Sequence, residues 1–575
     1  MIKNLNLRTA SLFLSIALSG LVGCNNAQDV VNVPSLVVLN ADVHTVDAAQ
    51  SRAEAFAVTN GRISAVGSSD DIQAMAGDST AVIDARGVTV TPGLIDAHTH
   101  LVMGSGLAVG VDLTDIEDKA EWLRIIRDKA ASLPEGNWIL GGAWNHNLSD
   151  GVLPTKEMLD SVAPNHPVWL RDIDGHSGWA NSLAMELAGV TAETPVPPGG
   201  EILIDPTTGE PTGIFLETAG YVFNDAPGMA EATEVSTGIR AAIRMANRFG
   251  ITSVHDMSGN FDRYLEVLEA GDMTLRIWEG ARPRPADGET AADTLARTAA
   301  ERERIRQRVA ATGLEAEQGP LFDLGFVKLI IDGVLSTRTA LMKEPYTDDP
   351  HVTVEPFSTK EELHDMIAQS HRQAFPVAVH AIGDLGVSWV LDGFALHTDR
   401  PGGLPNRVEH IEVVTPDDVA RFASLGIAAS MQPHHATCCV GDYVIDRIGR
   451  DRVPNAYVWR SMLAHEVALA LSADWPTSPL NPMIQIADSI HRETRIDGVV
   501  RPWDEGMSLT FAEALKGYTR TGAELTAWAD QIGSIEVGKW ADFVIYDQRI
   551  PDDVDRSVEN TQVTATYLAG RQVYP

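Results

Sequence analysis

The sequence is poor in cysteine and in positive charge. Its 575 residues include only three cysteines, too few to staple a chain of this length, so its stability has to come from a hydrophobic core. Lysine and arginine total 44 against 79 aspartates and glutamates, which gives a formal charge of −35 at pH 7. A surface this acidic repels phosphate backbones, which argues against nucleic acid as a partner.

Long apolar runs are also missing, apart from a short one at the N-terminus. Residues 1–23 carry Lys3 and Arg8 but no acid, and their apolar segment at 10–18 is too short to span a bilayer comfortably. A basic start, an apolar middle and small residues at the end are the organisation of a signal peptide. We therefore expect residues 1–23 to be removed from the mature protein.

The end of this segment, LVGC at 21–24, resembles the lipobox of bacterial lipoproteins. Cys24 would be lipidated and become the new N-terminus, with residues 24–34 as a tether; an ordinary signal beside a coincidental cysteine is the alternative. Membrane contact would then come through this lipid only. Its acyl chains would hold the protein to the membrane surface, because each buried methylene contributes roughly 0.8 kcal/mol. The expected location is the bacterial cell envelope, lipid-anchored and facing the periplasm. Asn25 differs from the inner-membrane retention residue aspartate, which favours the outer membrane.

Both ends of the remaining chain are rich in short strands. Residues 35–90 contain short segments of alternating apolar and polar residues around a hairpin signal at Asn60-Gly61. Residues 520–575 contain short segments with the same alternation. Two β-rich ends that flank a long middle predict one small β-sandwich built from both termini.

The middle, residues 91–519, alternates buried strands with helices, which predicts an α/β fold with a parallel sheet. Strands are expected near Val88–Asp96, Ile251–His255, Thr274–Trp278, Gly325–Ile331, Pro376–His380, Arg407–Ile411, Ile427–Met431 and Val467–Ser472. Eight such strands fit a TIM-type (β/α)8 barrel. About 150 residues separate the first two strands, far more than one crossover helix needs, so a large insertion after strand 1 is expected at about 105–235.

Histidines and one aspartate stand where several of these strands end. The segment 91–100, TPGLIDAHTH, runs into His98 and His100, whose side chains point to the same side of an extended chain. His380, His410 and Asp474 follow three other apolar runs. Barrel active sites gather at the C-terminal ends of the strands, and these side chains are ordinary zinc donors. The pattern therefore predicts a metal site at the barrel mouth.

Three segments are typical of one enzyme superfamily: VTPGLIDAHTH at 90–100, VKLIIDGVLSTRTA at 327–340 and GSIEVGKWADFV at 533–544. With them the sequence resembles the amidohydrolase superfamily of metal-dependent hydrolases over essentially all of 35–575. Within it, the sequence is most similar to the amidohydrolase family 3 group, which is related to N-substituted formamide deformylase. Ser336 and Thr337 stand where that group usually has Gly-Ser, which leaves the shape of this loop open.

The resemblance implies a role for each candidate ligand. His98 and His100 would hold a first metal ion together with Asp474, and His380 and His410 would hold a second. The expected cofactors are two zinc ions, although iron, manganese or cobalt would accept the same donors.

The resemblance also makes Lys328 the bridge between the two ions, as a carbamate formed with carbon dioxide. A carboxylated amine offers two oxygens to two cations, whereas an ammonium group would repel them. The alternative is a structural salt bridge at Lys328, with a single metal ion in the site.

The implied reaction is hydrolysis of an amide-type C–N bond, in a non-peptide amide, formamide or N-acyl compound, by a metal-activated hydroxide. Asp474 would accept the proton of the attacking water and pass it to the leaving nitrogen. A mononuclear N-acyl-amino-acid deacylase, an esterase or lactonase, and a metal-containing lipoprotein that binds its ligand without turnover are the alternatives.

The insertion adds candidates of its own. The segment 174–182, DGHSGWANS, resembles a family pattern in which His176 could contact substrate or stabilise an oxyanion, although a structural role fits nearly as well. Trp144-Asn145-His146 would line the pocket by position. After strand four, Arg338 could bind a substrate carboxylate or fix its loop through a salt bridge.

Other features carry weaker expectations. His255 ends strand two, where a buried hydrogen bond is expected rather than a place in the site. Cys438 and Cys439 follow His434 and His435, but adjacent cysteines cannot easily bind one ion, so a loop or a disulfide is favoured over a metal cluster. Some N-acyl-D-amino-acid deacylases use a cysteine ligand, which keeps that alternative open. The substrate, a small molecule, and the oligomeric state are left open, and only the resemblance suggests a homodimer.

Overall fold

The computed structural model describes residues 33–113, 116–146, 149, 151–173, 177–195, 200–229, 235–286, 288–398, 401–439, 443–496, 499–503 and 505–575. The predicted signal segment 1–23, the lipidation candidate Cys24 and the candidate His176 lie outside the described residues. Among the helices of the described part, none combines the length and the apolar character that crossing a membrane requires.

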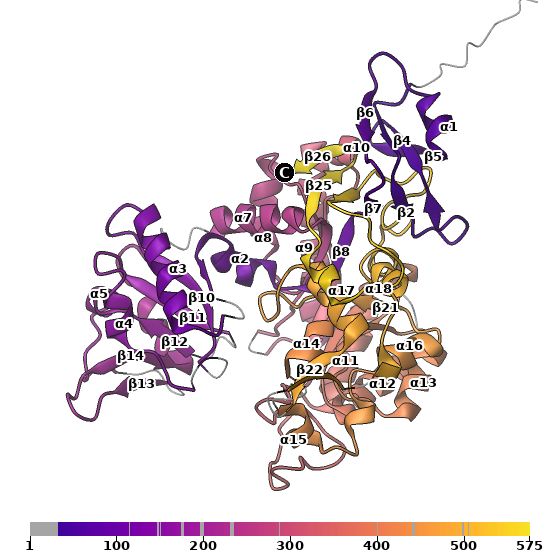
Figure 1. Ribbon diagram of the computed structural model, residues 1–575. Helices are drawn as coiled ribbons and strands as arrows, with labels where there is room; N and C mark the ends of the chain where they lie inside the picture. The colour runs from indigo at the N-terminus through magenta and orange to yellow at the C-terminus, as the bar shows by residue number, and fades with distance from the viewer. Residues whose placement is uncertain are drawn as a thin grey trace, which may run out of the picture.

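Eight parallel strands form the barrel expected in the middle of the chain (Figure 1). In sheet order they are β21 (Leu469–Leu471), β20 (Ala428–Met431), β19 (Arg407–His410), β18 (Val377–Ala381), β17 (Phe322–Ile330), β16 (Arg276–Ala281), β15 (Ile251–Asp256) and β8 (Leu94–Thr99). The Asp474 N–H donates to the His98 carbonyl (2.9 Å), and the His100 N–H donates to the Trp475 carbonyl (2.8 Å). These bonds join the last strand to the first, and the predicted TIM-type barrel is confirmed.

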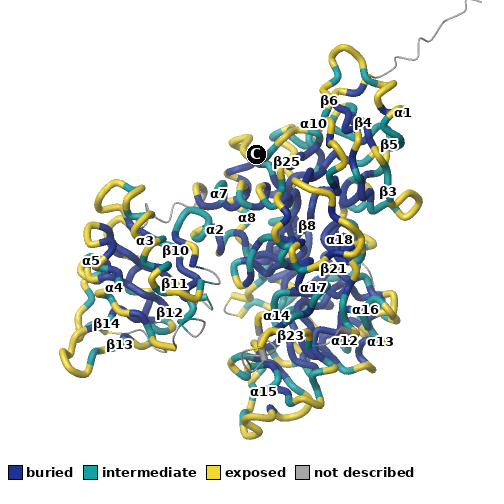
Figure 2. Tube along the Cα trace, viewed as in Figure 1, coloured by how far each residue is buried: buried dark blue, intermediate teal, exposed yellow. Residues whose placement is uncertain are grey.

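Helices pack around the outside of the barrel and bury its strands (Figures 1 and 2). They include α7 (Val235–Arg248), α8 (Phe261–Glu269), α9 (Ala291–Thr312), α11 (Lys360–Arg372), α12 (Asp384–Leu396), α13 (Pro416–Leu425), α16 (Trp459–Ala464), α17 (Pro482–His491) and α18 (Phe511–Gly517). Because both faces of each strand are covered, the strands are apolar almost throughout rather than alternating, as β18 illustrates with four of its five residues buried.

Strands from both ends of the chain form the predicted sandwich. One sheet contains β5 (Arg62–Gly67), β4 (Ala55–Thr59), β1 (Leu36–Leu39) and β6 (Ala81–Asp84). The other contains β26 (Arg571–Tyr574), β25 (Val563–Leu568), β24 (Phe543–Tyr546), β7 (Thr89–Pro92), β2 (Asp42–His44) and β3 (Arg52–Ala53). The Phe56 ring packs edge-on against Phe543 at 5.0 Å between centroids, so the N-terminal and C-terminal strands share one core. A fully buried ion pair between Arg276 and Asp542, with Nε and Oδ2 2.7 Å apart, fastens the sandwich to the barrel.

The first expected strand, 88–96, is two strands instead of one. β7 belongs to the sandwich and β8 to the barrel, and the chain changes sheets at Gly93. A Cβ atom on Gly93 would lie 2.1 Å from Oγ1 of Thr252 on the neighbouring strand β15, so only glycine fits this crossing. The apolar run continues through both strands, which is why hydropathy alone could not separate them.

The insertion after the first barrel strand is a separate α/β layer beside the barrel (Figure 1). Its sheet contains β13 (Glu201–Ile204), β14 (Pro211–Leu216), β12 (Ser177–Ala180), β11 (Val168–Asp172), β10 (Ile139–Trp144) and β9 (Val111–Asp112). Helices α3 (Lys119–Ser132), α4 (Lys156–Asp160) and α5 (Ser182–Leu187) accompany this sheet, and α2 (Leu101–Val109) and α7 connect it to the barrel. Three fully buried indoles, of Trp122, Trp144 and Trp179, pack together in its core.

The crossing at Gly93 predicts a specific stability defect. Gly93→Ala should force the new methyl group against Thr252 and lower the free energy of unfolding by about 1–3 kcal/mol or more, as overpacking does. Thermal unfolding followed by circular dichroism measures the change. Gly67→Ala is the matched control, because a Cβ there meets no heavy atom within 4 Å. Equal melting temperatures for the two variants would contradict this account of the crossing.

Candidate metal centre

The histidine of the first barrel strand, His98, is held in place by an aspartate between the strand ends. Asp96 is fully buried, and its Oδ1 accepts the backbone N–H of His98 at 3.1 Å. Its Oδ2 accepts the N–H of Ala473, next to Asp474, at 3.1 Å. Burial raises the pKa of Asp96 well above its usual value, and the backbone bonds oppose that rise. Asp96 thus places the side chains of His98 and Asp474 side by side.

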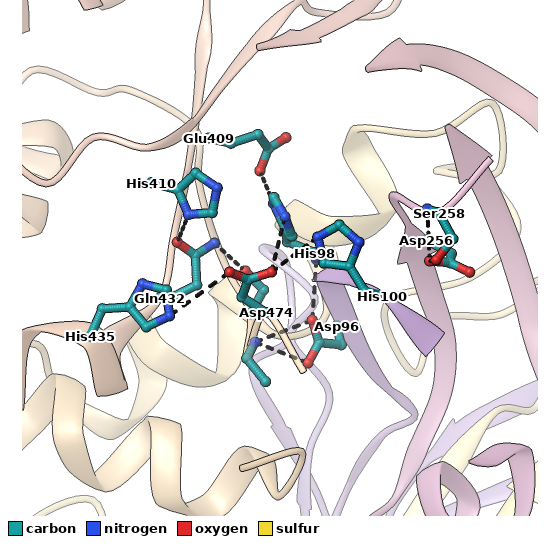
Figure 3. Close-up of polar contacts among 12 residues, drawn as sticks. Asp96, His98, His100, Asp256, Ser258, Glu409, His410, Gln432, His435 and Asp474 are labelled. Carbon is teal, nitrogen blue, oxygen red and sulfur yellow. Dashed lines mark hydrogen bonds and ion pairs between the residues drawn. The ribbon is translucent and has the colours of Figure 1, made fainter. Parts of the chain in front are cut away.

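Three side chains from three strand ends converge on one point (Figure 3). Each of His98, His410 and Asp474 is buried and offers one ligand atom, and the three atoms lie within 4.8 Å of one another. Nε2 of His98 is 3.2 Å from Oδ1 of Asp474, and Nε2 of His100 is 3.4 Å from the same oxygen. His98 lies in β8 and His410 in β19, whereas His100 directly follows β8 and Asp474 lies three residues after β21, so all four lie at the strand ends that the barrel geometry predicts.

A second set of contacts orients the two central imidazoles. Nδ1 of His98 lies 2.7 Å from Oε2 of Glu409, and since a carboxylate can only accept, Nδ1 carries the proton and the lone pair is on Nε2. Glu409 is itself paired with Arg407 at 2.7 Å. Nδ1 of His410 donates to Oε1 of Gln432 at 2.9 Å, which leaves its Nε2 as the ligand atom. Such outer contacts fix the tautomer of metal-binding histidines.

Charge and burial suit the site to a divalent cation. Burial lowers the pKa of His100 and of His380 to about 3, so both are neutral near pH 7. Burial alone would raise the pKa of Asp474, but the neighbouring imidazoles outweigh it and hold that pKa well below its usual value. Nε2 of His98 and Oδ1 of Asp474 are buried without a hydrogen-bond partner in the described structure. Neutral imidazoles, a carboxylate and unsatisfied lone pairs that face one another are the donor set that zinc prefers.

Lys328 and His380 complete the predicted set around this group. The imidazole of His380 lies 4.4 Å from that of His410 between ring centroids, and its Nε2 is 3.3 Å from the carbonyl oxygen of Gly333. Lys328 is only 4% exposed, and burial lowers the pKa of its amine to about 8 although Glu409 and Asp474 oppose the shift. The division of these ligands between two ions stays a prediction, since the tightest group takes members from both predicted sets.

His435 is a site residue that the sequence reasoning set aside. It lies on α14 (Pro433–Cys439), directly after β20, and its Nε2 is 3.9 Å from Oδ2 of Asp474. Cys438, on the same helix, is disulfide-bonded and so offers no thiolate. The available signal was position: like the other candidates, Gln432 and His435 follow a buried barrel strand.

The remaining candidates lie elsewhere. Trp144 is 0% exposed in the core of the insertion, where its Nε1 donates to the Leu170 carbonyl at 3.0 Å, and its role at the pocket stays a prediction. Arg338 pairs with Asp348 at 2.8 Å, which is the loop-fixing alternative. His255 is buried, and its Nδ1 accepts from Arg407 at 2.6 Å.

Comparisons with known proteins agree with this geometry. The model of the amidohydrolase family matches residues 81–574. The chain is 32% identical to Protein LONG AFTER FAR-RED 3 of Arabidopsis thaliana, over 94% of this chain and 92% of that one. It is 29% identical to the N-substituted formamide deformylase of Arthrobacter pascens, over 93% and 97%. An uncharacterized metal-dependent hydrolase from Pyrococcus horikoshii OT3 has the same fold, with a TM-score of 0.68, 23% identity, and coverage of 91% and 99%.

The contact between His98 and Glu409 predicts how metal affinity responds to mutation. Glu409→Gln keeps an acceptor for Nδ1 but removes the negative charge that stabilises the ring, so zinc affinity should fall by about 10–100-fold. Competition against a chromophoric chelator measures the affinity. Glu412→Gln is the control, because Glu412 is also buried beyond the end of β19 and faces His435 instead of His98. A Glu409→Gln protein that retains full zinc affinity would contradict this role.

Proposed function

Because the chain belongs to the amidohydrolase family, we propose that this metal-dependent hydrolase cleaves an amide-type C–N bond of a small, non-peptide substrate, such as a formamide or an N-acyl compound. The observation that carries the proposal is the buried group of His98, His410 and Asp474, in which the unpartnered Nε2 of His98 faces the unpartnered Oδ1 of Asp474. The relative from Arthrobacter pascens, a formamide deformylase aligned over 97% of its length, supports the amide as substrate class.

The residues around this group divide the work of hydrolysis. His98 and His410 present Nε2 lone pairs, held in that direction by Glu409 and Gln432. A divalent cation bound there would polarise the scissile carbonyl and make a water molecule more acidic. Asp474 has one oxygen near the imidazoles of β8 and a second, Oδ2, on the other side. That carboxylate accepts the proton of the attacking water and returns it to the leaving nitrogen.

We further propose that Lys328 is carbamylated and that the site holds two ions. Carboxylation requires the neutral amine, and burial brings the pKa of Lys328 down to about 8, so roughly a tenth of the amine is neutral at pH 7 and this fraction grows as the pH rises through that value. The described structure gives Lys328 no hydrogen bond or ion pair that would hold it as an ammonium. The lipid anchor at Cys24, the envelope location and a homodimer also stay predictions.

Metal removal and one substitution test the proposed reaction. Dialysis against a strong chelator should abolish hydrolysis of a panel of formamides and N-acyl amino acids, and zinc should restore it. In the reloaded protein, Asp474→Asn should lower kcat by roughly 10²–10⁴-fold, because the proton acceptor is gone. Asp417→Asn, at the exposed first turn of α13, is the control. Undiminished activity after chelation would refute the metal-dependent reaction. Faster cleavage of dipeptides or esters than of formamides and N-acyl amino acids would refute the proposed substrate class.

The state of Lys328 can be observed directly. Incubation with isotopically labelled bicarbonate should give a carbamate signal in carbon NMR, stronger above pH 8 than below it, and Lys328→Met should remove the signal. Mass spectrometry should then find about one metal ion per chain in the variant and about two in the wild type. One ion and no carbamate in the wild type would favour the mononuclear deacylase or esterase alternative.

A further inference from the structure

Arg282 is a half-buried cation that directly follows the third barrel strand, β16. In the part of the chain that the structure describes, its guanidinium has no hydrogen bond and no ion pair. Burial lowers the pKa of Arg282, the neighbouring Arg284 lowers it further, and no carboxylate opposes the shift. Arg276 and Arg407 lie deeper, and each pairs with a carboxylate at 2.7 Å. A charge withdrawn from water without a counterion costs free energy, and a ligand of opposite charge would remove that cost.

The register of the barrel sheet places Arg282 beside the candidate metal centre. In the parallel pairing of β16 with β17, Ala281 lies opposite Val327. Arg282, one residue further along, is therefore level with Lys328 at the strand ends where barrel sites form. Its aliphatic stem packs against the loop after β15, because a Cβ atom on Gly259 would lie 3.3 Å from Cβ and 3.4 Å from Cγ of Arg282.

The guanidinium of Arg282 acts on two residues of the site. Burial is the main cause that lowers the pKa of His100 to about 3 and that of Lys328 to about 8, and the positive charge of Arg282 contributes to both shifts. His100 directly follows β8 and Lys328 lies on β17, and the order of the sheet places β16 between these strands. A charge that acts on both residues lies over the barrel mouth rather than on the outer surface.

A guanidinium at this place suits an anionic group of the substrate. Its planar fork can form two parallel hydrogen bonds to one carboxylate, which makes arginine the usual partner of that group. Arg338, the other candidate for this role, is already paired with Asp348 at 2.8 Å. The chain carries a formal charge of −35, and Asp474 and Glu409 add negative charge at the mouth, so an anionic substrate needs a cation of the chain to receive it.

We propose that Arg282 is a specificity-determining residue, which binds a carboxylate that the substrate carries next to the scissile amide, so that the site prefers N-acyl amino acids to neutral amides. The inference rests on the proposed amide hydrolysis and narrows its substrate class. The carboxylate takes no part in bond cleavage, so its contact with Arg282 is the same in the bound substrate and in the transition state. Its loss should therefore raise KM more than it lowers kcat.

Matched pairs of substrates test this role. Each N-formyl or N-acetyl amino acid is compared with its own carboxamide, which has nearly the same shape without the charge. The zinc-loaded wild type should prefer the acid in kcat/KM, and Arg282→Met should lower this preference by about 10–100-fold, because hydrogen bonds to a charged group are lost. Since the preference is a ratio measured on one protein, a general loss of activity cancels. Arg282→Lys, which keeps the charge but not the fork, should keep part of the preference.

Arg284→Met is the matched control. Arg284 carries the same charge two residues further along, but it is exposed, and its guanidinium has no hydrogen bond or ion pair in the described structure. Its loss should leave the preference for the acid at the wild-type value. Equal losses in Arg282→Met and Arg284→Met would indicate a diffuse attraction of anions and overturn the direct contact.

Metal content and thermal unfolding are measured for every variant. Metal lost from both Arg282→Met and Arg282→Lys would make Arg282 a structural part of the metal centre and overturn its role in substrate binding. An active wild type without preference for the acid, or a preference that Arg282→Met retains, would overturn the inference alone. A wild type that is inactive on acids and carboxamides alike would refute the proposed function itself.

Discussion

Closure of the barrel between its last and first strands is the constraint on which the site depends. The two backbone bonds between 98–100 and 474–475 bring residues almost 380 positions apart in sequence to neighbouring places, and Asp96 reinforces the joint with its side chain. Without this closure His98 and Asp474 would belong to opposite edges of an open sheet. The parallel arrangement then brings His380 and His410 to the same end, because every strand of a TIM-type barrel ends at one face.

The interior also has to accommodate charge in a chain that is strongly acidic overall. The buried Arg407 offsets Glu409 and donates to His255, and its guanidinium lies 4.5 Å from the centre of the Phe326 ring. Breaking one member of such a chain would leave a buried charge unpaired, which costs far more than an exposed ion pair is worth. The carboxylates of Asp474 and Glu412 have no such arginine partner in the described structure, and they face imidazoles instead. This arrangement leaves negative charge at the mouth for a cation or a protonated ring to balance.

Sequence patterns located most of the barrel because apolar runs and strand ends are local properties. The runs that end at His380, His410 and Asp474 are barrel strands whose side chains or following residues reach the site. The change of sheet at Gly93 could not be predicted, since it depends on Thr252, which lies far along the chain. The burial of Trp144 could not be predicted, because its position in the insertion does not reveal which face of β10 it occupies. His435 was set aside because its neighbouring cysteines suggested a loop or a disulfide.

The attachment of the insertion explains how so large an addition can leave the ligand geometry undisturbed. The chain departs for the insertion directly after His100, through α2, so any shift of the insertion would act on this ligand first. Two contacts resist that shift. Oδ1 of Asp256 accepts the N–H of Leu101 at 3.2 Å, and Gly104 lets α2 lie against the Trp475 ring, since a Cβ there would come within 2.3 Å of it. Both contacts are made with barrel residues, Asp256 and Trp475, so His100 is anchored to the barrel rather than to the insertion. The insertion can therefore change without displacing this ligand from the strand ends.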